Sequence, residues 1–213
     1  MQRERRRFES CRVHQFIKNH MAEVKIIHEG WINADCKKAG KELTTSPTIS
    51  LIKDEGITAI VDPGEMPSQQ VLIDELKNEG LEIKDITHVF VTHSHIDHYR
   101  NVGMFPETAI VVEFFGQWQE GRDSEATDLK FGKFSKNIEI ISTSGHNYDG
   151  ISFLVTTDKG VVAVVGDVWW KENYPTKDPY ATDLNELEKS RKKILDLADY
   201  IVPGHGKMFK IEK

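Results

Sequence analysis

The sequence contains little cysteine and no long hydrophobic run. Two cysteines among 213 residues, Cys11 and Cys36, exclude a disulfide framework and a zinc finger built from cysteines. They fit a reducing compartment, so we expect a cytoplasmic protein. The longest purely apolar run covers residues 161–165, whereas a membrane-spanning helix needs about 20 apolar residues. We therefore expect no membrane span.

An excess of positive charge is also missing. The chain has 28 Lys and Arg against 34 Asp and Glu, which gives a formal net charge of −6. This argues against a nucleic-acid scaffold that is basic as a whole, although a local basic patch stays open. Hydrophobic residues make up 38% and charged residues 29%, which is typical of a folded globular domain.

The first 20 residues differ from the rest of the chain. Five arginines crowd this stretch, and no apolar segment of the kind found in secretory signals follows them. Such a charge run is more often a solvated tail than a nucleic-acid-binding arm. The length suits one domain, so we expect a disordered extension over residues 1–21 and a single domain over residues 22–213.

Beyond this stretch, β-branched runs alternate with helical patterns. Helices are expected at residues 69–79, after Ser68, and at residues 184–198, where Thr182 or Asp183 is the cap. Many strands in two groups indicate an α/β protein with two sheets packed face to face and covered by helices. Strands are expected at residues 24–27, 48–52, 57–61, 86–92, 108–112, 138–142, 151–156, 161–165 and 200–202.

Three of the nine histidines lie within six residues. His93, His95 and His98 follow a predicted strand, and Asp97 stands between them. Side chains two apart in an extended segment point the same way, so His93 and His95 can converge on one ion. Asp97 and His98 can then face a second ion nearby. Burying this cluster without a metal would be costly, and its ligand types suit zinc, with iron or manganese as alternatives.

Three later residues extend this set of metal ligands. His146, Asp167 and His205 each lie beyond a predicted strand and directly after a glycine, which allows a close approach of the backbone. Each signal is weak alone, but together they give enough ligands for two divalent ions that share one carboxylate. The predicted ligands are His93, His95, Asp97, His98, His146, Asp167 and His205.

Residues 93–98 read His-x-His-x-Asp-His, which resembles the signature of the metallo-β-lactamase superfamily. The resemblance covers about residues 24–213 and implies an αββα four-layer sandwich with a binuclear metal site at one edge of the sheets. It implies that Asp62 organises the site from behind the ligands, although Asp-Pro-Gly is also an ordinary turn sequence. The implied ligands are His93, His95 and His146 for one ion and Asp97, His98 and His205 for the other, with Asp167 bridging.

Subfamilies of this superfamily differ at individual ligand positions. Zinc β-lactamases commonly have cysteine at the position of Asp167, and flavodiiron proteins have glutamate at the position of His95. Residues 101–106 read Asn-x-Gly-x-Phe-Pro, and this motif is similar to the group around metallo-β-lactamase domain-containing protein 1. That group also departs from the common superfamily pattern after His146, and its resemblance implies an endoribonuclease.

The resemblance implies a hydrolase in which Asp97 and Asp167 orient a hydroxide and handle its proton. Three functions stay open: a phosphodiesterase acting on RNA, a glyoxalase II-like hydrolase of a small thioester or ester, and an iron-dependent oxygen or redox protein. A homodimer is a further expectation. The predicted substrate contacts are Arg100, Tyr148, Trp169 and Trp170, for each of which packing or plain exposure is the alternative. The last helix carries a basic side formed by Lys189, Arg191, Lys192 and Lys193.

Overall fold

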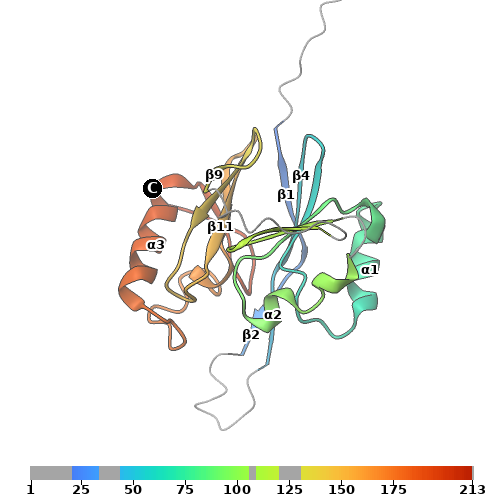
Figure 1. The fold of residues 1–213 in the computed structure, drawn as a ribbon. Coiled ribbons are helices and arrows are strands. Elements are labelled where there is room, and N and C mark those ends of the chain that lie inside the picture. Colours follow the sequence, from blue (N-terminus) through green and yellow to red (C-terminus); the bar gives the residue numbers. More distant parts are fainter. Residues whose placement is uncertain (1–20, 34–43, 106–108, 120–130, 213) are drawn as a thin grey trace, which may run out of the picture.

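A computed structural model describes residues 21–33, 44–105, 109–119 and 131–212 (Figure 1). The predicted extension over residues 1–21 therefore lies outside the described residues, apart from Met21. Two six-stranded sheets pack face to face, and each carries helices on its outer side. This αββα sandwich confirms the predicted fold class. Within the described residues, no helix is both long and apolar enough to cross a bilayer.

The strands form the two large sheets and one small sheet. The first sheet has the order β1 (Glu23–His28), β4 (Ile49–Asp54), β5 (Ile57–Val61), β6 (His88–Phe90), β7 (Ile110–Glu113) and β8 (Gly116–Trp118). The second sheet has the order β14 (Phe209–Lys210), β13 (Tyr200–Val202), β12 (Gly160–Val164), β11 (Ile151–Thr157), β10 (Ile138–Ser142) and β9 (Gly132–Lys133). β2 (Trp31–Ile32) and β3 (Thr45–Ser46) pair antiparallel as a separate two-stranded sheet.

Two helices cover the sandwich. α1 (Gln69–Asn78) packs Leu72 and Leu76 on the first sheet, and α3 (Leu184–Leu197) packs on the second. Of the two predicted caps, Thr182 and Asp183, the structure has Asp183, whose side chain accepts bonds from two backbone N–H groups of α3. The remaining helical pieces are α2 (Ile96–Tyr99), η2 (Ile83–Asp85), η3 (Val102–Met104) and η4 (Gly166–Val168).

Parallel pairing brings the chemically important segments to one edge. β5, β6 and β7 run parallel in the first sheet, and β12 and β13 run parallel in the second. Their carboxyl ends therefore meet at the same edge of the sandwich. The strand expected at residues 86–92 covers only His88–Phe90 in the structure. Ile86 still ends η2, and after Val91, whose backbone N–H donates to Val112 O of β7 at 3.0 Å, the chain leaves the sheet toward that edge.

At the opposite end of the sandwich, Asp54 at the β4–β5 turn connects the two sheets through hydrogen bonds. Its carboxylate accepts bonds from Ser135 Oγ (2.6 Å) and Asn137 Nδ2 (2.7 Å) beside the second sheet. Burial raises the pKa of Asp54, but these hydrogen bonds more than offset that effect and hold the pKa below its usual value. Asp54 therefore links the two sheets as a carboxylate.

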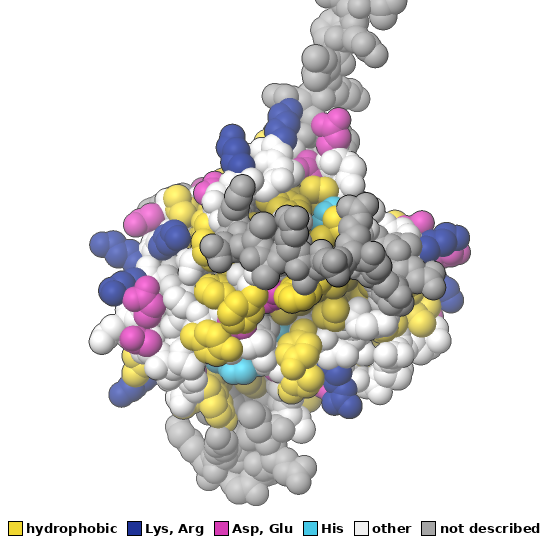
Figure 2. Space-filling view, viewed as in Figure 1, with side chains coloured by type: hydrophobic (Ala, Val, Ile, Leu, Met, Phe, Trp, Pro, Cys, Tyr) yellow, Lys and Arg dark blue, Asp and Glu magenta, His cyan; other side chains and the backbone are white. Residues whose placement is uncertain are grey.

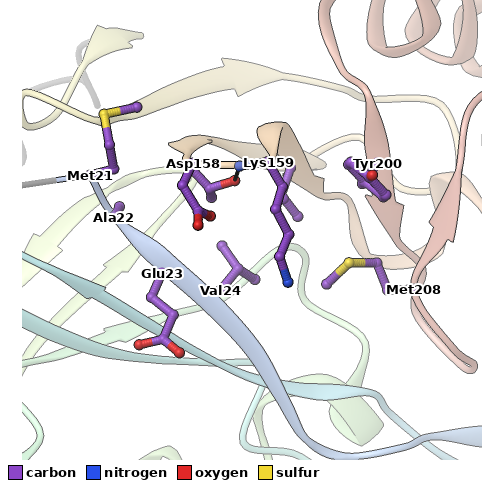
Figure 3. A pocket seen from close by; sticks show the side chains of 10 residues that line it. Met21, Ala22, Glu23, Val24, Asp158, Lys159, Tyr200 and Met208 are labelled. Carbon is purple, nitrogen blue, oxygen red and sulfur yellow. Dashed lines mark hydrogen bonds between the residues drawn. The ribbon is translucent and has the colours of Figure 1, made fainter.

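A cavity of about 570 Å³ opens at this same end (Figure 3). It lies between the start of β1 and the β11–β12 turn, and Lys159 extends across it toward Val24 and Met208. The predicted metal ligands all follow strand ends at the other edge. The candidate functional site is therefore the edge that carries the metal-donor atoms and not the end that carries this cavity.

Candidate metal centre

The seven predicted ligands come together at the edge where the parallel strands end. Four of them follow β6: His93 and His95 lie in the segment directly after the strand, and Asp97 and His98 lie within the single turn of α2. The others come from the second sheet: His146 lies in the β10–β11 loop, Asp167 in η4 after β12, and His205 after β13. The site is therefore built from both sheets and requires them to be packed together.

The donor atoms form two groups that meet at one carboxylate. Within each group, one ligand atom from every residue lies within 4.8 Å of the others. Asp167 Oδ2 lies 3.3 Å from His146 Nε2, while Asp167 Oδ1 lies 3.3 Å from His98 Nε2 and 3.1 Å from His205 Nε2. The groups are His93, His95, His146 and Asp167, and Asp97, His98 and His205.

Asp62 holds one of these ligands in place. It is 2% exposed and has a φ of +51°, an unusual backbone conformation for a residue with a side chain. Its carboxylate accepts bonds from Thr92 N (2.8 Å), Thr92 Oγ1 (2.7 Å) and His98 Nδ1 (2.8 Å). This leaves His98 Nε2 to face the donor group, as expected for a residue that orients a metal-binding imidazole.

Two buried polar atoms in the site indicate that its residues fit a metal ion. Among the described residues, five buried side-chain polar atoms lack a hydrogen bond of good geometry. Two of them, His98 Nε2 and Asp167 Oδ1, lie 3.3 Å apart in this site. Buried polar atoms normally have a hydrogen-bond partner, since leaving them unpaired costs free energy. Both atoms point into the space that the two donor groups share. A set of imidazole and carboxylate donors with such unsatisfied atoms fits divalent cations.

Two supporting residues were missed by the sequence analysis. Asp178 is 3% exposed and accepts a bond of 2.6 Å from His146 Nδ1. Thr45 Oγ1 donates to Asp97 Oδ2 (3.2 Å) and lies 3.0 Å from His205 Nδ1. Neither residue belongs to a recognisable motif, and both are far along the chain from their partners. No sequence signal distinguished them from other polar loop residues.

Two histidines of the site, His93 and His98, have pKa values shifted in opposite directions. Burial lowers the pKa of His93 well below its usual value, and neighbouring His98 adds to the effect. Burial also opposes the charged form of His98, but Asp167 and Asp62 outweigh it and raise that pKa well above the usual range. The pKa of Asp167 is held well below its usual range because His205 and His98 outweigh the effect of burial. Asp167 is therefore ionised and stabilises positive charge between the two donor groups.

Glycine is required where the ligand loops approach their neighbours. A methyl group at Gly204 would overlap Asp167 Oδ1, and one at Gly145 would overlap the backbone of Leu187 in α3. Gly145 also has a φ of +130°, which L-residues rarely adopt. The two glycines allow the loops of His205 and His146 to pack against η4 and α3.

The comparisons agree with this geometry. Residues 44–115 match the family model of the metallo-beta-lactamase superfamily. Metallo-beta-lactamase domain-containing protein 1 from Xenopus laevis is 33% identical over 198 residues, covering 89% of this chain and 82% of that protein. This chain belongs to the metallo-beta-lactamase superfamily. The rat protein of the same name is 29% identical and covers 87% of this chain and 76% of its own length.

Solved structures of the superfamily share the fold. A crystal structure from Thermotoga maritima described as a metallo-beta-lactamase has a TM-score of 0.66 at 21% identity, covering 90% of this chain and 100% of its own. An N-acyl homoserine lactone hydrolase, with N-hexanoyl-L-homoserine bound at its catalytic metal centre, has a TM-score of 0.61 at 17% identity, covering 87% and 92%. Its membership of this superfamily makes the chain a metal-dependent hydrolase.

The predicted substrate contacts lie in different environments. Trp169 and Trp170 are a correction, because both are buried: Trp169 packs in the hydrophobic cluster beneath α3, and Trp170 lies behind His146 with ring centroids 6.4 Å apart. Neither presents a face to a substrate. Arg100 is exposed and pairs with Glu65 at 2.6 Å.

Tyr148 belongs to a group of aromatic side chains that we call the aromatic ridge. Tyr148 is 62% exposed, and its ring lies 6.5 Å from the ring of Phe115, which lies 5.1 Å from that of Phe114. Phe131 continues the ridge, 6.1 Å from Phe114. In Figure 2 hydrophobic side chains gather across the middle of this face, with histidine side chains among them. The ridge joins the β7–β8 turn to the loop of His146, so it connects both sheets at the edge of the candidate centre.

Proposed function

We propose that this chain is a binuclear zinc hydrolase that cleaves the phosphodiester bonds of RNA. The binuclear part rests on one observation: the Asp167 carboxylate lies within 3.3 Å of nitrogen atoms from both donor groups. Nitrogen and oxygen donors without cysteine suit zinc, and iron or manganese are the alternatives. The proposed ligands are His93, His95 and His146 for one ion and Asp97, His98 and His205 for the other, with Asp167 between them.

When bound, two divalent cations supply Lewis acidity and a hydroxide nucleophile at neutral pH. The chain's own residues orient the ligands and move the proton. Asp62 and Asp178 fix the Nδ1 positions of His98 and His146, which keeps each Nε2 toward the centre. The side chain of Asp97 is 18% exposed and that of Asp167 is 7% exposed. Asp97 is therefore the better placed of the two carboxylates to take the proton of the nucleophile.

The aromatic ridge supports RNA as the substrate. Bases stack on exposed aromatic side chains, which contributes about 1–3 kcal/mol per base and tolerates different sequences. Phe115 and Tyr148 are 52% and 62% exposed, and Tyr148 is two residues from His146. A single strand whose bases lie on the ridge would carry its backbone along the metal centre. The resemblance to the metallo-β-lactamase domain-containing protein 1 group also implies an endoribonuclease.

A small ester, thioester or lactone is the second candidate substrate. The same ridge is apolar enough to hold an acyl chain, and an N-acyl homoserine lactone hydrolase shares the fold. Arg100, which would otherwise be free to meet a phosphate near α2, is paired with Glu65. These three observations favour a neutral substrate, so the experiment must compare phosphodiesters with neutral esters and lactones.

The test is the initial rate of metal-loaded protein on four substrates: a chromogenic phosphodiester, a labelled single-stranded RNA, a thioester and a lactone. We expect turnover of the phosphodiester and the RNA, which Asp167→Asn abolishes. Phe115→Ala and Tyr148→Ala should raise KM for the RNA at least tenfold and leave the rate on the small phosphodiester unchanged. Turnover of the thioester or lactone alone would refute the nuclease proposal and support the second candidate.

Metal analysis and oxygen uptake test the remaining alternative. Iron in the purified protein together with substrate-dependent oxygen consumption would support a redox protein instead of a hydrolytic zinc centre. The cytoplasmic location, for which the low cysteine content is the support, and the homodimer stay predictions. Light scattering on the full chain measures the oligomeric state directly.

A further inference from the structure

Arg191 does not contribute to a basic surface. The sequence predicts a basic side of the last helix that includes Arg191, but Arg191 is buried at 7% exposure, whereas Lys192 beside it is exposed. The physical reason is that its guanidinium turns inward from α3 and lies 5.7 Å from the ring of Trp169. Burying an arginine is costly unless its donors are satisfied, so its partners indicate what it does.

The partners of Arg191 are backbone carbonyl groups of one segment. Its Nε donates to Val168 O at 3.0 Å, its Nη2 to Pro175 O at 2.9 Å and its Nη1 to Thr176 O at 3.2 Å. Nη1 also donates to Glu188 on the same helix at 2.8 Å. The planar guanidinium thus binds both ends of residues 168–176 at once. The ammonium group of a lysine cannot reproduce three bonds in this fork geometry.

The segment held by Arg191 connects two carboxylates of the candidate centre. Val168 directly follows Asp167, and Thr176 is two residues before Asp178. Asp167 lies between the two donor groups, and Asp178 binds His146. Fixing both ends of the segment on α3 therefore fixes the separation of these two side chains.

The same segment also sets the position of a third residue. The backbone N–H of Gly204 donates to Trp169 O at 2.9 Å, and that of His205 donates to Trp170 O at 2.7 Å. These two bonds hold the His205 loop in register with residues 169 and 170. A shift of the segment away from α3 would therefore move Asp167, His146 and His205 together, and these are the three ligands that the second sheet provides.

We propose that Arg191 is a positioning residue for the metal centre. It acts from α3 through the backbone of residues 168–176 and aligns the second-sheet ligands with those that follow β6. The proposal rests on the proposed binuclear centre and not on RNA as the substrate. It also predicts that the segment is in place before metal binds, because its anchor is a protein side chain.

The variants Arg191→Lys and Arg191→Ala test this proposal, with Lys192→Ala as the matched control on the same helix. Each protein is titrated with Zn²⁺ against a chromophoric chelator, and the cobalt-loaded forms are compared by visible absorption. We expect both Arg191 variants to keep the wild-type far-UV circular dichroism but to bind at least one ion about tenfold more weakly. Their cobalt spectra should change, and added guanidinium ion should restore the spectrum of Arg191→Ala. Lys192→Ala should behave as wild type.

Wild-type affinity and an unchanged cobalt spectrum in Arg191→Lys would overturn the proposal. If the variants do not fold, hydrogen exchange of the wild-type protein decides: residues 168–176 should be equally protected with and without metal. Protection that arises only after metal is added would mean that the metal orders the segment, and would also overturn the proposal. Two bound ions without phosphodiester turnover would contradict the proposed RNA substrate and leave the role of Arg191 intact. A wild-type chain that binds fewer than two ions would contradict both the proposed binuclear centre and the role of Arg191 that rests on it.

Discussion

Removing the Asp178 carboxylate should weaken metal binding by the group that contains His146. Asp178 is 3% exposed, and its Oδ2 accepts from His146 Nδ1 at 2.6 Å while its Oδ1 accepts from Tyr180 N at 2.8 Å. With Nδ1 bound to Asp178, His146 Nε2 is the ring nitrogen that faces the donor group and can bind a metal ion. Without this bond, the imidazole loses both its orientation and the negative charge that makes it a better ligand.

The expected loss of affinity follows from the buried geometry. A hydrogen bond to a charged group contributes about 1.5–3 kcal/mol, and each 1.4 kcal/mol is about tenfold in affinity. Asp178→Ala should therefore bind zinc about 10- to 100-fold more weakly, which is the usual effect of losing such a partner. Asp178→Asn keeps one acceptor oxygen for two N–H donors, so we expect a smaller loss than for Asp178→Ala.

Zinc titration against a chromophoric chelator measures this effect, with thermal unfolding of the metal-free protein recorded in parallel. Asp196→Ala, which removes an exposed carboxylate from α3, serves as the control for net charge. If Asp178→Ala folds and binds two zinc ions with wild-type affinity, the bond to His146 does not tune the ligand. The reasoning about Asp178 would then be wrong.

Three further predictions follow from other parts of the structure. Asp167→Asn should bind one metal ion per chain or fewer instead of two, measured by elemental analysis after dialysis; two retained ions would contradict the bridging role. Gly145→Ala should lower the free energy of unfolding by about 2–5 kcal/mol, because strain at positive φ adds to a backbone overlap. Gly56→Ala, with φ +73° but open space around it, should lower it by only about 1–2 kcal/mol, and equal losses in denaturant titrations would contradict this account. Asp54→Asn should lower the free energy of unfolding by about 1.5–3 kcal/mol at pH 7. The pKa of Asp54 is lower in the folded state than in the unfolded state. The ionised carboxylate therefore stabilises the fold fully above its unfolded-state pKa of about 3.9, and this stabilisation is lost as the pH falls through the folded-state pKa. The difference between wild type and Asp54→Asn should therefore narrow below about pH 4 in urea titrations, and a difference independent of pH would contradict this assignment.

Regular elements could be predicted because local residues determine them. β10 has the predicted bounds, and α3 begins after the predicted cap Asp183. The edge strands β8, β9 and β14 have two or three residues each, too few to show a period. Their pairing comes from the neighbouring strands rather than from their own sequence, which is why they were not predicted.

The candidate ligands, which the structure brings together, could be found in the sequence because the chemistry of a metal site restricts residue types. Imidazole and carboxylate groups spaced around glycines are informative even without a structure. Supporting residues carry no such restriction: Asp178 and Thr45 are ordinary polar residues until the fold brings them to His146 and Asp97. Arg191 was misjudged for a related reason. The residues that follow it are exposed lysines, and apart from Glu188 its partners are backbone carbonyl groups, which no sequence pattern records.

The division of the ligands between the two sheets has a consequence for folding. Four donors follow β6, and the other three come from loops after β10, β12 and β13. Neither half of the chain presents a complete set for either ion, so a nascent first half can hold metal only weakly. Contacts between residues this far apart form late, because loop closure must precede them. Metal capture should therefore be among the final events of folding, and a chelator should speed unfolding while leaving the early collapse of each sheet unaffected.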